Sequence, residues 1–228
     1  LIKLLYYFMF DKLPISSKTE KILTKSLDEP ISAEDANYLI NIKGSDLYPL
    51  LATADYLRQE IAGNNVTFIN NCNINFTNIC TVRCGFCAFG KDADDPEAYI
   101  LDDEAILKKA QGAVDKGAHE FCVMGGVLPD ADVEYYEHLL QLLKGEFPNI
   151  MIHGFSPTMI KDASVVSGIS VEDAFERLKS AGLDTLPGTA AEILTDRSRE
   201  IICPEKVTTQ EWIDIVKTAH EVGIPGSA

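Results

Sequence analysis

The run Asn78-Ile-Cys-Thr-Val-Arg-Cys-Gly-Phe-Cys-Ala-Phe89 carries the strongest signal in this sequence. It places Cys80, Cys84 and Cys87 in the spacing C-x3-C-x2-C. A 4Fe–4S cluster is ordinarily held by four cysteine thiolates. Three clustered cysteines therefore predict a cluster with one iron left open for a substrate or cofactor. An open coordination position separates catalytic from structural metal sites, a rule stated for zinc that we extend here by analogy.

The composition describes an acidic protein with enough apolar residues for a substantial core. The 228 residues are 46% hydrophobic, and 20 basic against 35 acidic residues give a net charge of −15. This charge disfavours nucleic acid and anionic membranes, and we expect neither as a partner. Cys72, Cys122 and Cys203 are dispersed, which suits a reducing cytoplasmic location better than a disulfide scaffold.

Hydrophobic periodicity divides the chain into two regions. Residues 1–64 show helical patterns only, including a helix capped by Ser32 and another over 45–62, so we expect an N-terminal helical extension there. The apolar segment 1–10 is too short to span a bilayer, which takes about 20 residues, and is interpreted as a helix or the edge of a partial sequence. The second region, 65–228, alternates between strands and helices. Its predicted strands are 66–74, 120–124, 150–155 and 183–186, and its predicted helices are 102–116, 132–144, 170–180, 190–199 and 208–222.

This alternation predicts βαβ units, a parallel sheet and an α/β fold. The order fits a TIM-type (β/α) barrel, whose functional residues lie at the carboxyl ends of its strands. The cysteine run follows the first predicted strand, Gly125-Gly126 the second, His153 ends the third, and Pro187-Gly188 follows the fourth. Only four complete strands are visible, so we predict a partial barrel that is truncated at the C-terminus.

A zinc site is the structural alternative for the three cysteines. Structural zinc sites usually combine two pairs of ligands, with the members of a pair two to four residues apart. A distant His or Cys would have to complete the set here, because the sequence has no second cysteine pair. A metal-binding module without enzymatic activity therefore stays open beside the cluster hypothesis.

The C-x3-C-x2-C spacing with Phe86 before the last cysteine resembles the motif of the radical S-adenosylmethionine (SAM) superfamily. The resemblance implies that the three thiolates hold a 4Fe–4S cluster whose fourth iron binds SAM. It also implies a reductant, cleavage of SAM to a 5′-deoxyadenosyl radical, and a partial (β/α) barrel of the radical SAM type. Phe86, Gly125 and Gly126 become cofactor-binding candidates, since backbone groups of a glycine-rich stretch bind the SAM amino group in that superfamily.

Further runs resemble the CofH family, the tyrosine-using half of deazaflavin (FO) synthase. They are Asn73-Ile-Asn-Phe-Thr-Asn-Ile-Cys80, His153-Gly-Phe-Ser-Pro157, Pro187-Gly-Thr-Ala-Ala-Glu-Ile-Leu194 and Thr218-Ala-His-Glu-Val-Gly-Ile-Pro225. The related radical SAM enzymes of futalosine-dependent menaquinone synthesis typically carry Pro-Gly-Gly-Gly-Ala-Glu where this chain has Pro187-Gly-Thr-Ala-Ala-Glu192. They are the alternative family.

The CofH resemblance implies a transferase of coenzyme F(420) biosynthesis. In that reaction a hydrogen is taken from L-tyrosine, its Cα–Cβ bond breaks, and the 4-hydroxybenzyl group adds to 5-amino-6-(D-ribitylamino)uracil. A second radical SAM subunit, similar to CofG, then acts on the product. Both small molecules are therefore expected substrates.

His153 and Glu192 have both a functional and a structural interpretation, and Ser156 has a functional one. His153 could bind tyrosine or move a proton, since its charge changes near neutral pH, or it could be a buried core residue. Ser156 is a substrate-binding candidate by its position. Glu192 could act in catalysis or accept hydrogen bonds from SAM ribose or a substrate amine, or it could be a carboxylate at a helix N-terminus. We expect Cys122 to be a packing residue and Cys203 to be structural.

Overall fold

A computed structural model describes residues 15–189 and 191–227 of the chain. The chain divides into two compact units, Leu1–Phe68 and Ile69–Ala228, which are described separately here. The apolar segment 1–10 lies outside the described residues. No helix in the described ranges combines the length and apolar character that crossing a membrane requires.

The N-terminal unit is built from helices α2 (Ser17–Ser26), α3 (Ala33–Leu39) and α4 (Leu47–Ala62), with a short 3-10 turn at Gly44–Asp46. Its small core consists of Ile22, Leu23 and Leu39. Ser32 caps α3 as predicted, because its hydroxyl accepts a hydrogen bond from the Asp35 N–H at 3.1 Å.

The second unit contains a parallel sheet in the order β1 (Asn71–Asn75), β2 (Glu120–Met124) and β3 (Met151–Gly154). Isolated parallel bridges from His153 to Thr185 and from Leu186 to Gly226 continue this sequential order. Phe121 and Val123 of β2 are fully buried and belong to the core with the helices. Because side chains alternate between the two faces of a strand, Cys122 and Met124 point to the opposite face.

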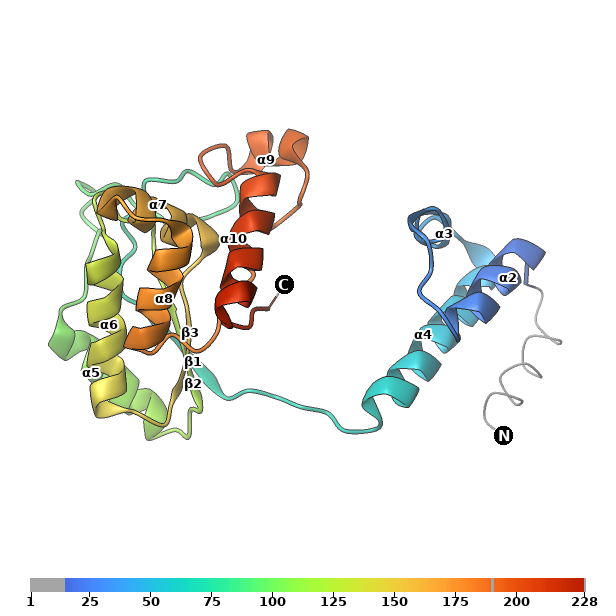
Figure 1. Ribbon diagram of the computed structural model, residues 1–228, viewed down its shortest axis with the longest axis horizontal. Helices are drawn as coiled ribbons and strands as arrows, with labels where there is room; N and C mark the ends of the chain where they lie inside the picture. The colour runs from blue at the N-terminus through green and yellow to red at the C-terminus, as the bar shows by residue number, and fades with distance from the viewer. Residues whose placement is uncertain (1–14, 190, 228) are drawn as a thin grey trace. The chain divides into compact units, whose positions relative to one another are not determined.

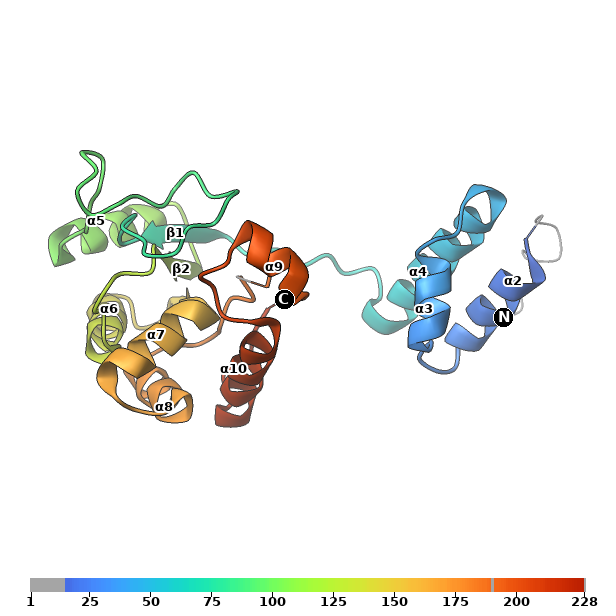
Figure 2. The ribbon, with the colours of Figure 1, turned by 90° about the horizontal axis from the view of Figure 1, so that it is seen from above.

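Six helices follow or separate the strands of this unit (Figure 1). They are α5 (Asp103–Val114), α6 (Val133–Glu146), α7 (Pro157–Ser167), α8 (Val171–Ala181), α9 (Asp196–Ile202) and α10 (Thr209–Val222). Helix α8 contacts α6, α7 and α10, and Figure 2 shows these four helices grouped on one side of β1 and β2. A parallel sheet in sequential order with helices on one face confirms the prediction of a partial (β/α) barrel.

Several predicted elements differ from the structure. The first strand begins at Asn71 rather than at residue 66, and Val66 and Phe68 are 91% and 87% exposed. The predicted strand 183–186 forms only isolated bridges, from Thr185 to His153 and from Leu186 to Gly226. Helix α7 was not predicted, although Ser156 and Pro157 supply its N-cap and first residue. Helix α9 begins at Asp196, so the prediction of a helix over 191–195 is wrong, and residue 190 lies outside the described residues.

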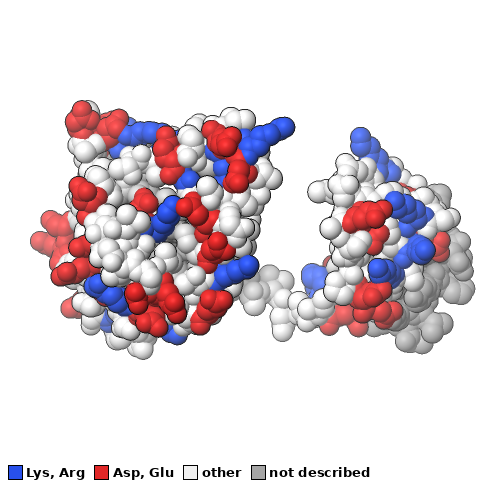
Figure 3. All heavy atoms as spheres, turned by 45° about the horizontal axis from the view of Figure 1, so that its top comes forward, with Lys and Arg blue, Asp and Glu red and all other residues white. Residues whose placement is uncertain are grey.

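Acidic side chains are spread over the surface of the second unit, with Lys and Arg side chains between them (Figure 3). Several of these charges are paired within the unit, as in the ion pairs Arg177–Glu137 and Lys144–Asp184. Exposed pairs of this kind contribute little to stability, about 0–1 kcal/mol each. The face shown in Figure 3 therefore has the mixed character of an ordinary solvated surface.

Candidate active site

The carboxyl ends of the strands surround one cavity that contains the cysteine loop. Its empty volume is about 620 Å³, a figure that includes solvent space at its open mouth. It is lined by Cys80, Val82, Cys84, Phe86, Cys87, Phe89, Gly90, Met124, Gly125, Gly126, Val127, Ser156, Thr158, Thr189, Glu192 and Lys206. The structure thus brings together eight of the nine site residues expected from the sequence, and His153 is the exception.

The cysteine loop is held by hydrogen bonds to backbone groups outside it. The Cys80 Sγ accepts the Val127 N–H at 3.3 Å and donates to the Val82 carbonyl at 3.4 Å. The Cys80 N–H donates to the Lys91 carbonyl at 3.1 Å, and the Gly85 N–H donates to the Ile202 carbonyl at 2.8 Å. The loop is therefore anchored both to the segment after β2 and to the end of α9.

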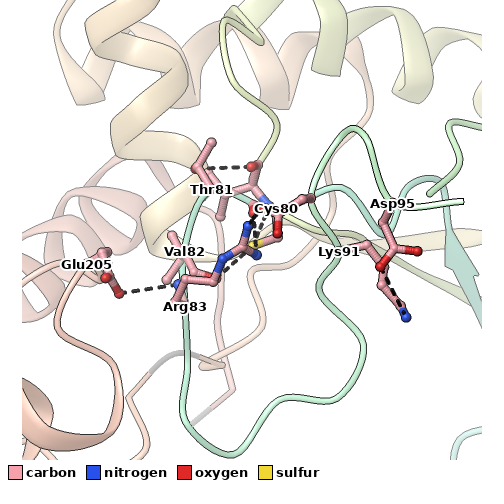
Figure 4. A network of polar contacts seen from close by, with 9 residues as sticks. Cys80, Thr81, Val82, Arg83, Lys91, Asp95 and Glu205 are labelled. Atoms are coloured by element: carbon pink, nitrogen blue, oxygen red, sulfur yellow. Dashed lines mark hydrogen bonds and ion pairs between the residues drawn. The ribbon is translucent and has the colours of Figure 1, made fainter. Parts of the chain in front are cut away.

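Arg83 supports the loop from within (Figure 4). Its Nη1 donates to the Cys80 carbonyl at 3.0 Å, and its guanidinium also pairs with Asp92. Its backbone N–H donates to the Glu205 carboxylate at 3.2 Å. These contacts connect the cysteine loop to the segment between α9 and α10, which carries Lys206 into the cavity.

The two glycines after β2 are required by close packing against the cysteine loop. A Cβ on Gly126 would lie 2.1 Å from the Ile79 carbonyl oxygen and 2.8 Å from the Cys80 Cβ. A Cβ on Gly125 would lie 2.9 Å from the Phe76 ring. Backbone oxygen and carbon cannot approach so closely, so both positions need a residue without a side chain.

The backbone groups of this glycine pair are only partly available to a ligand. The Gly126 N–H donates to the Thr77 carbonyl at 3.0 Å, so this donor is already engaged. No described residue donates a hydrogen bond to the carbonyl oxygens of Gly125 and Gly126. Since an amino group donates hydrogen bonds, these carbonyls are the groups that could receive it.

Ser156 and Thr158 present hydroxyl groups at the start of α7. The Ser156 hydroxyl accepts the Met159 N–H at 3.3 Å and so serves as the N-cap. Thr158 is 2% exposed, and its Oγ1 has no hydrogen-bond partner among the described residues. A buried hydroxyl without a partner costs about 1–3 kcal/mol, so Thr158 marks a place where a ligand could supply the missing bond. Thr158 was not predicted as a site residue, although its position just after a strand end was a usable signal.

Glu192 lies in the loop before α9 and not in a helix, which rules out the helix N-terminal interpretation. Its Oε1 is 2.6 Å from the Lys206 ammonium, and its other oxygen is 3.9 Å from Arg199. The Lys206 ammonium also lies 5.4 Å from the centre of the Phe86 ring, a cation–π contact. Lys206 is a cavity residue that the sequence analysis missed, because only the folded chain brings it to the cysteine loop.

His153 is not among the residues that line this cavity. Its Nδ1 lies 2.6 Å from the Thr185 hydroxyl, across the bridge between β3 and the next segment. Burial lowers the pKa of His153, and the neighbouring Glu120 opposes this effect. The lowered pKa favours the neutral form of the imidazole.

The residues present fit a cluster better than a single metal ion. Within the described part of the chain, no three His, Cys, Asp or Glu side chains converge closely enough to hold one ion. A cluster binds each cysteine to a different iron, so its cysteines can stand farther apart. Burial raises the pKa of the Cys84 thiol, and the charge of Lys206 opposes this shift. Binding iron would displace the thiol proton, as metal binding does in general.

The fold and the cysteine loop together define a (β/α)-barrel protein with three cysteines at the carboxyl ends of its strands. Residues 74–228 match the radical SAM superfamily, and the chain belongs to that superfamily. Two solved structures share the fold at low sequence identity. The FeFe-hydrogenase maturase HydG from Carboxydothermus hydrogenoformans has a TM-score of 0.69 at 19% identity, over 91% of this chain and 46% of its own. The methylornithine synthase PylB has a TM-score of 0.64 at 18% identity, over 92% of this chain and 57% of its own.

The chain is much more similar in sequence to curated 5-amino-6-(D-ribitylamino)uracil–L-tyrosine 4-hydroxyphenyl transferases. It is 48% identical to the protein of this name from Methanothermobacter thermautotrophicus, over 92% of this chain and 58% of that protein. It is 43% identical to the one from Nostoc sp., over 87% of this chain and 52% of that protein. The chain thus spans somewhat more than half the length of these relatives.

Proposed function

We propose that the protein to which this chain belongs joins the 4-hydroxybenzyl group of L-tyrosine to 5-amino-6-(D-ribitylamino)uracil in deazaflavin (FO) synthesis. The observation that carries the proposal is the cavity, in which one loop of three cysteines faces Gly126, Ser156 and Glu192. The similarity to transferases named for this reaction supports these substrates over the futalosine-type alternative.

In this proposal Cys80, Cys84 and Cys87 hold a 4Fe–4S cluster, and SAM binds its open iron. When bound, the cluster and SAM supply a carbon radical that can remove a hydrogen atom from an unactivated position. The protein's own task is to position the reactants and keep water away. The lining residues Val82, Phe89 and Val127 make part of the cavity wall apolar, which serves that task.

Other residues of the cavity have proposed binding roles. The carbonyls of Gly125 and Gly126 accept hydrogen bonds from the SAM amino group, beside the Phe86 ring. Glu192 accepts hydrogen bonds from ribose hydroxyls or a substrate amine, and Lys206 orients its carboxylate from 2.6 Å away. Ser156 and His153 bind substrate, Ser156 from the cavity rim and His153 from the sheet.

The reaction also needs partners that the chain does not contain. A reductant has to deliver an electron to the cluster, and a second radical SAM subunit similar to CofG would act on the product. Oxygen-sensitive clusters and unpaired cysteines are best preserved in the reducing cytoplasm, which is the location we propose.

The test is a product assay on the full-length, cluster-loaded protein under anaerobic conditions. SAM and dithionite are added with tyrosine and the aminouracil, or in parallel with futalosine-type substrates, and products are weighed by mass spectrometry. We expect an adduct of the 4-hydroxybenzyl group and the aminouracil only in the first reaction. A product only in the futalosine-type reaction would overturn the proposal in favour of that alternative, and no product in either would reject both.

A further inference from the structure

The inner face of the sheet carries a row of polar side chains outside the cysteine cavity. Asn73 pairs in register with Cys122, Cys122 with His153, and His153 with Thr185. These four residues lie side by side across four consecutive segments of the parallel sheet. Their face is the one opposite Phe121, Val123 and Ile152, which are buried against the helices.

The row lies directly below the cysteine cavity. Met124 lines that cavity, and Cys122 precedes it by two residues on the same face of β2. Two residues of a strand span about 6.6 Å, so the row is one step deeper into the barrel than the cavity wall. A ligand of moderate length could therefore reach from the row to the cysteine loop.

The chemistry of the row is unusual for a barrel interior. The inward side chains of a (β/α) barrel normally form packed layers dominated by Val, Ile and Leu. This row instead offers an amide, an imidazole and a hydroxyl, with the small Cys122 between them. Burial raises the pKa of the Cys122 thiol, so this group stays uncharged. Asn73 is exposed and Cys122, His153 and Thr185 are half-buried, so a bound polar molecule could reach these uncharged donors and acceptors.

The hydrogen-bonding capacity of the row is only partly used within the protein. The bond between the His153 Nδ1 and the Thr185 hydroxyl, at 2.6 Å, fixes the orientation of the imidazole. No described residue hydrogen-bonds the His153 Nε2 or the Asn73 side-chain amide. An amide both donates and accepts, and a neutral imidazole that accepts at one nitrogen donates at the other.

The charges of the residues around the row favour one of the two proposed substrates over the other. None of the residues of β1, β2 and β3 or of segment 183–186 is Lys or Arg, and Glu120 lies next to the row on β2. A tyrosine carboxylate would find no cation there and one carboxylate nearby. The aminouracil is uncharged and carries lactam N–H and C=O groups and ribityl hydroxyls, which match the donors and acceptors of the row.

We infer that Asn73, His153 and Thr185 form the binding site of the uncharged aminouracil, with Cys122 as the small packing residue between them. The inference rests on the proposed function and assigns one of its two substrates to this row of side chains. Tyrosine would then be bound elsewhere, nearer the cysteine cavity.

The test is direct binding, measured by anaerobic titration calorimetry on the full-length, cluster-loaded protein. Thr185→Val removes the hydroxyl while keeping the shape, and Asn73→Leu removes the amide. Each should weaken binding of 5-amino-6-(D-ribitylamino)uracil roughly tenfold and change tyrosine binding by less than about twofold. Thr185→Ser, which keeps the hydroxyl, should retain the wild-type affinity, and Thr218→Val on α10 serves as a matched control away from the row.

Unchanged aminouracil affinity in both row variants would overturn the inference, and so would a loss confined to tyrosine. Thermal unfolding of each variant separates a binding effect from misfolding, and Asn73→Leu keeps the test decisive if Thr185→Val does not fold. Wild-type protein that binds the aminouracil through the row but forms no adduct would reject the proposed reaction and leave the inference standing. Adduct formation with unaffected row variants would reject the inference alone.

Discussion

Replacing Gly126 by Ala is the sharpest single test of how the cysteine loop is held. The new Cβ would lie 2.1 Å from the Ile79 carbonyl oxygen, whereas ordinary contacts begin at 3.4 Å. The loop or strand β2 would therefore have to move by about 1.3 Å. The obstacle is backbone, which cannot rotate out of the way as a flexible side chain would.

Overpacking of this kind costs about 1–3 kcal/mol, and we expect Gly126→Ala to lie at the upper end. For a chain of this size a loss of about 3 kcal/mol corresponds to a Tm decrease on the order of 6–12 °C. Because Cys80 follows Ile79 directly, the same shift moves the first cysteine. We therefore also expect a clear loss of iron and sulfide after anaerobic reconstitution.

The assay pairs thermal unfolding by circular dichroism with iron and sulfide analysis of the same preparations. Gly112→Ala is the matched control, since Gly112 lies inside α5 and its Cβ would meet nothing within 4 Å. Alanine is favoured over glycine there by roughly 0.5–1 kcal/mol, so this variant should be slightly more stable. A Gly126→Ala protein with wild-type Tm and full iron content would refute the close approach between β2 and the cysteine loop.

Three further predictions concern the cavity and the helix that follows it. Thr158→Val should leave the stability of the protein unchanged or raise it slightly, because it removes a buried hydroxyl that has no hydrogen-bond partner among the described residues. The same variant should weaken SAM binding about three- to tenfold, measured by equilibrium dialysis. Equal SAM affinity would show that the hydroxyl contacts no ligand. Lys206→Met should lower the free energy of unfolding in urea by about 1–2 kcal/mol. The double variant with Glu192→Gln should lose less than the sum of the two single losses, because the two charged groups are 2.6 Å apart and interact. Strictly additive losses would contradict this ion pair. Hydrogen bonds from Lys161 and Thr208 lower the pKa of Glu211 to about 2 from its usual 4.5, so its contribution is present above pH 4.5 and is lost as the pH falls toward 2. Glu211→Gln should therefore lower the free energy of unfolding by about 1 kcal/mol at pH 7 and by less at pH 3. Glu221→Gln on the same helix is the control. A loss of stability that is the same at both pH values would contradict the role of the Glu211 charge.

The sequence was sufficient for the parts of the fold that depend on local pattern. Strand β2 was predicted with its observed bounds, 120–124, because alternating burial and the flanking glycines are both local signals. The first strand was predicted five residues too early, because Val66 and Phe68 have high β-propensity but are exposed in the structure. Helix α7 was missed because Ser156 was interpreted as a site residue and not as the N-cap of a helix that begins at Pro157.

The site shows the same division between local and tertiary information. The three cysteines, Gly125 and Gly126 could be predicted because their spacing and their positions after strands are features of the sequence. The contact of Lys206 with Glu192 could not, since it joins residues of two loops on either side of α9. The hydroxyl of Thr158 became notable only when its burial without a partner was known. His153 was expected beside the other site residues, but the register of the sheet places it one row deeper.

The central claim is that the cysteine loop holds a SAM-cleaving cluster. The most direct measurement is the amount of 5′-deoxyadenosine formed from SAM and dithionite by reconstituted full-length protein, compared with its Cys84→Ala and Cys72→Ala variants. We expect cleavage with a visible-absorbing iron–sulfide cluster in the wild type and in Cys72→Ala, and neither in Cys84→Ala. A Cys84→Ala protein that keeps its cluster and cleaves SAM, or a wild type that binds zinc without sulfide, would contradict the account.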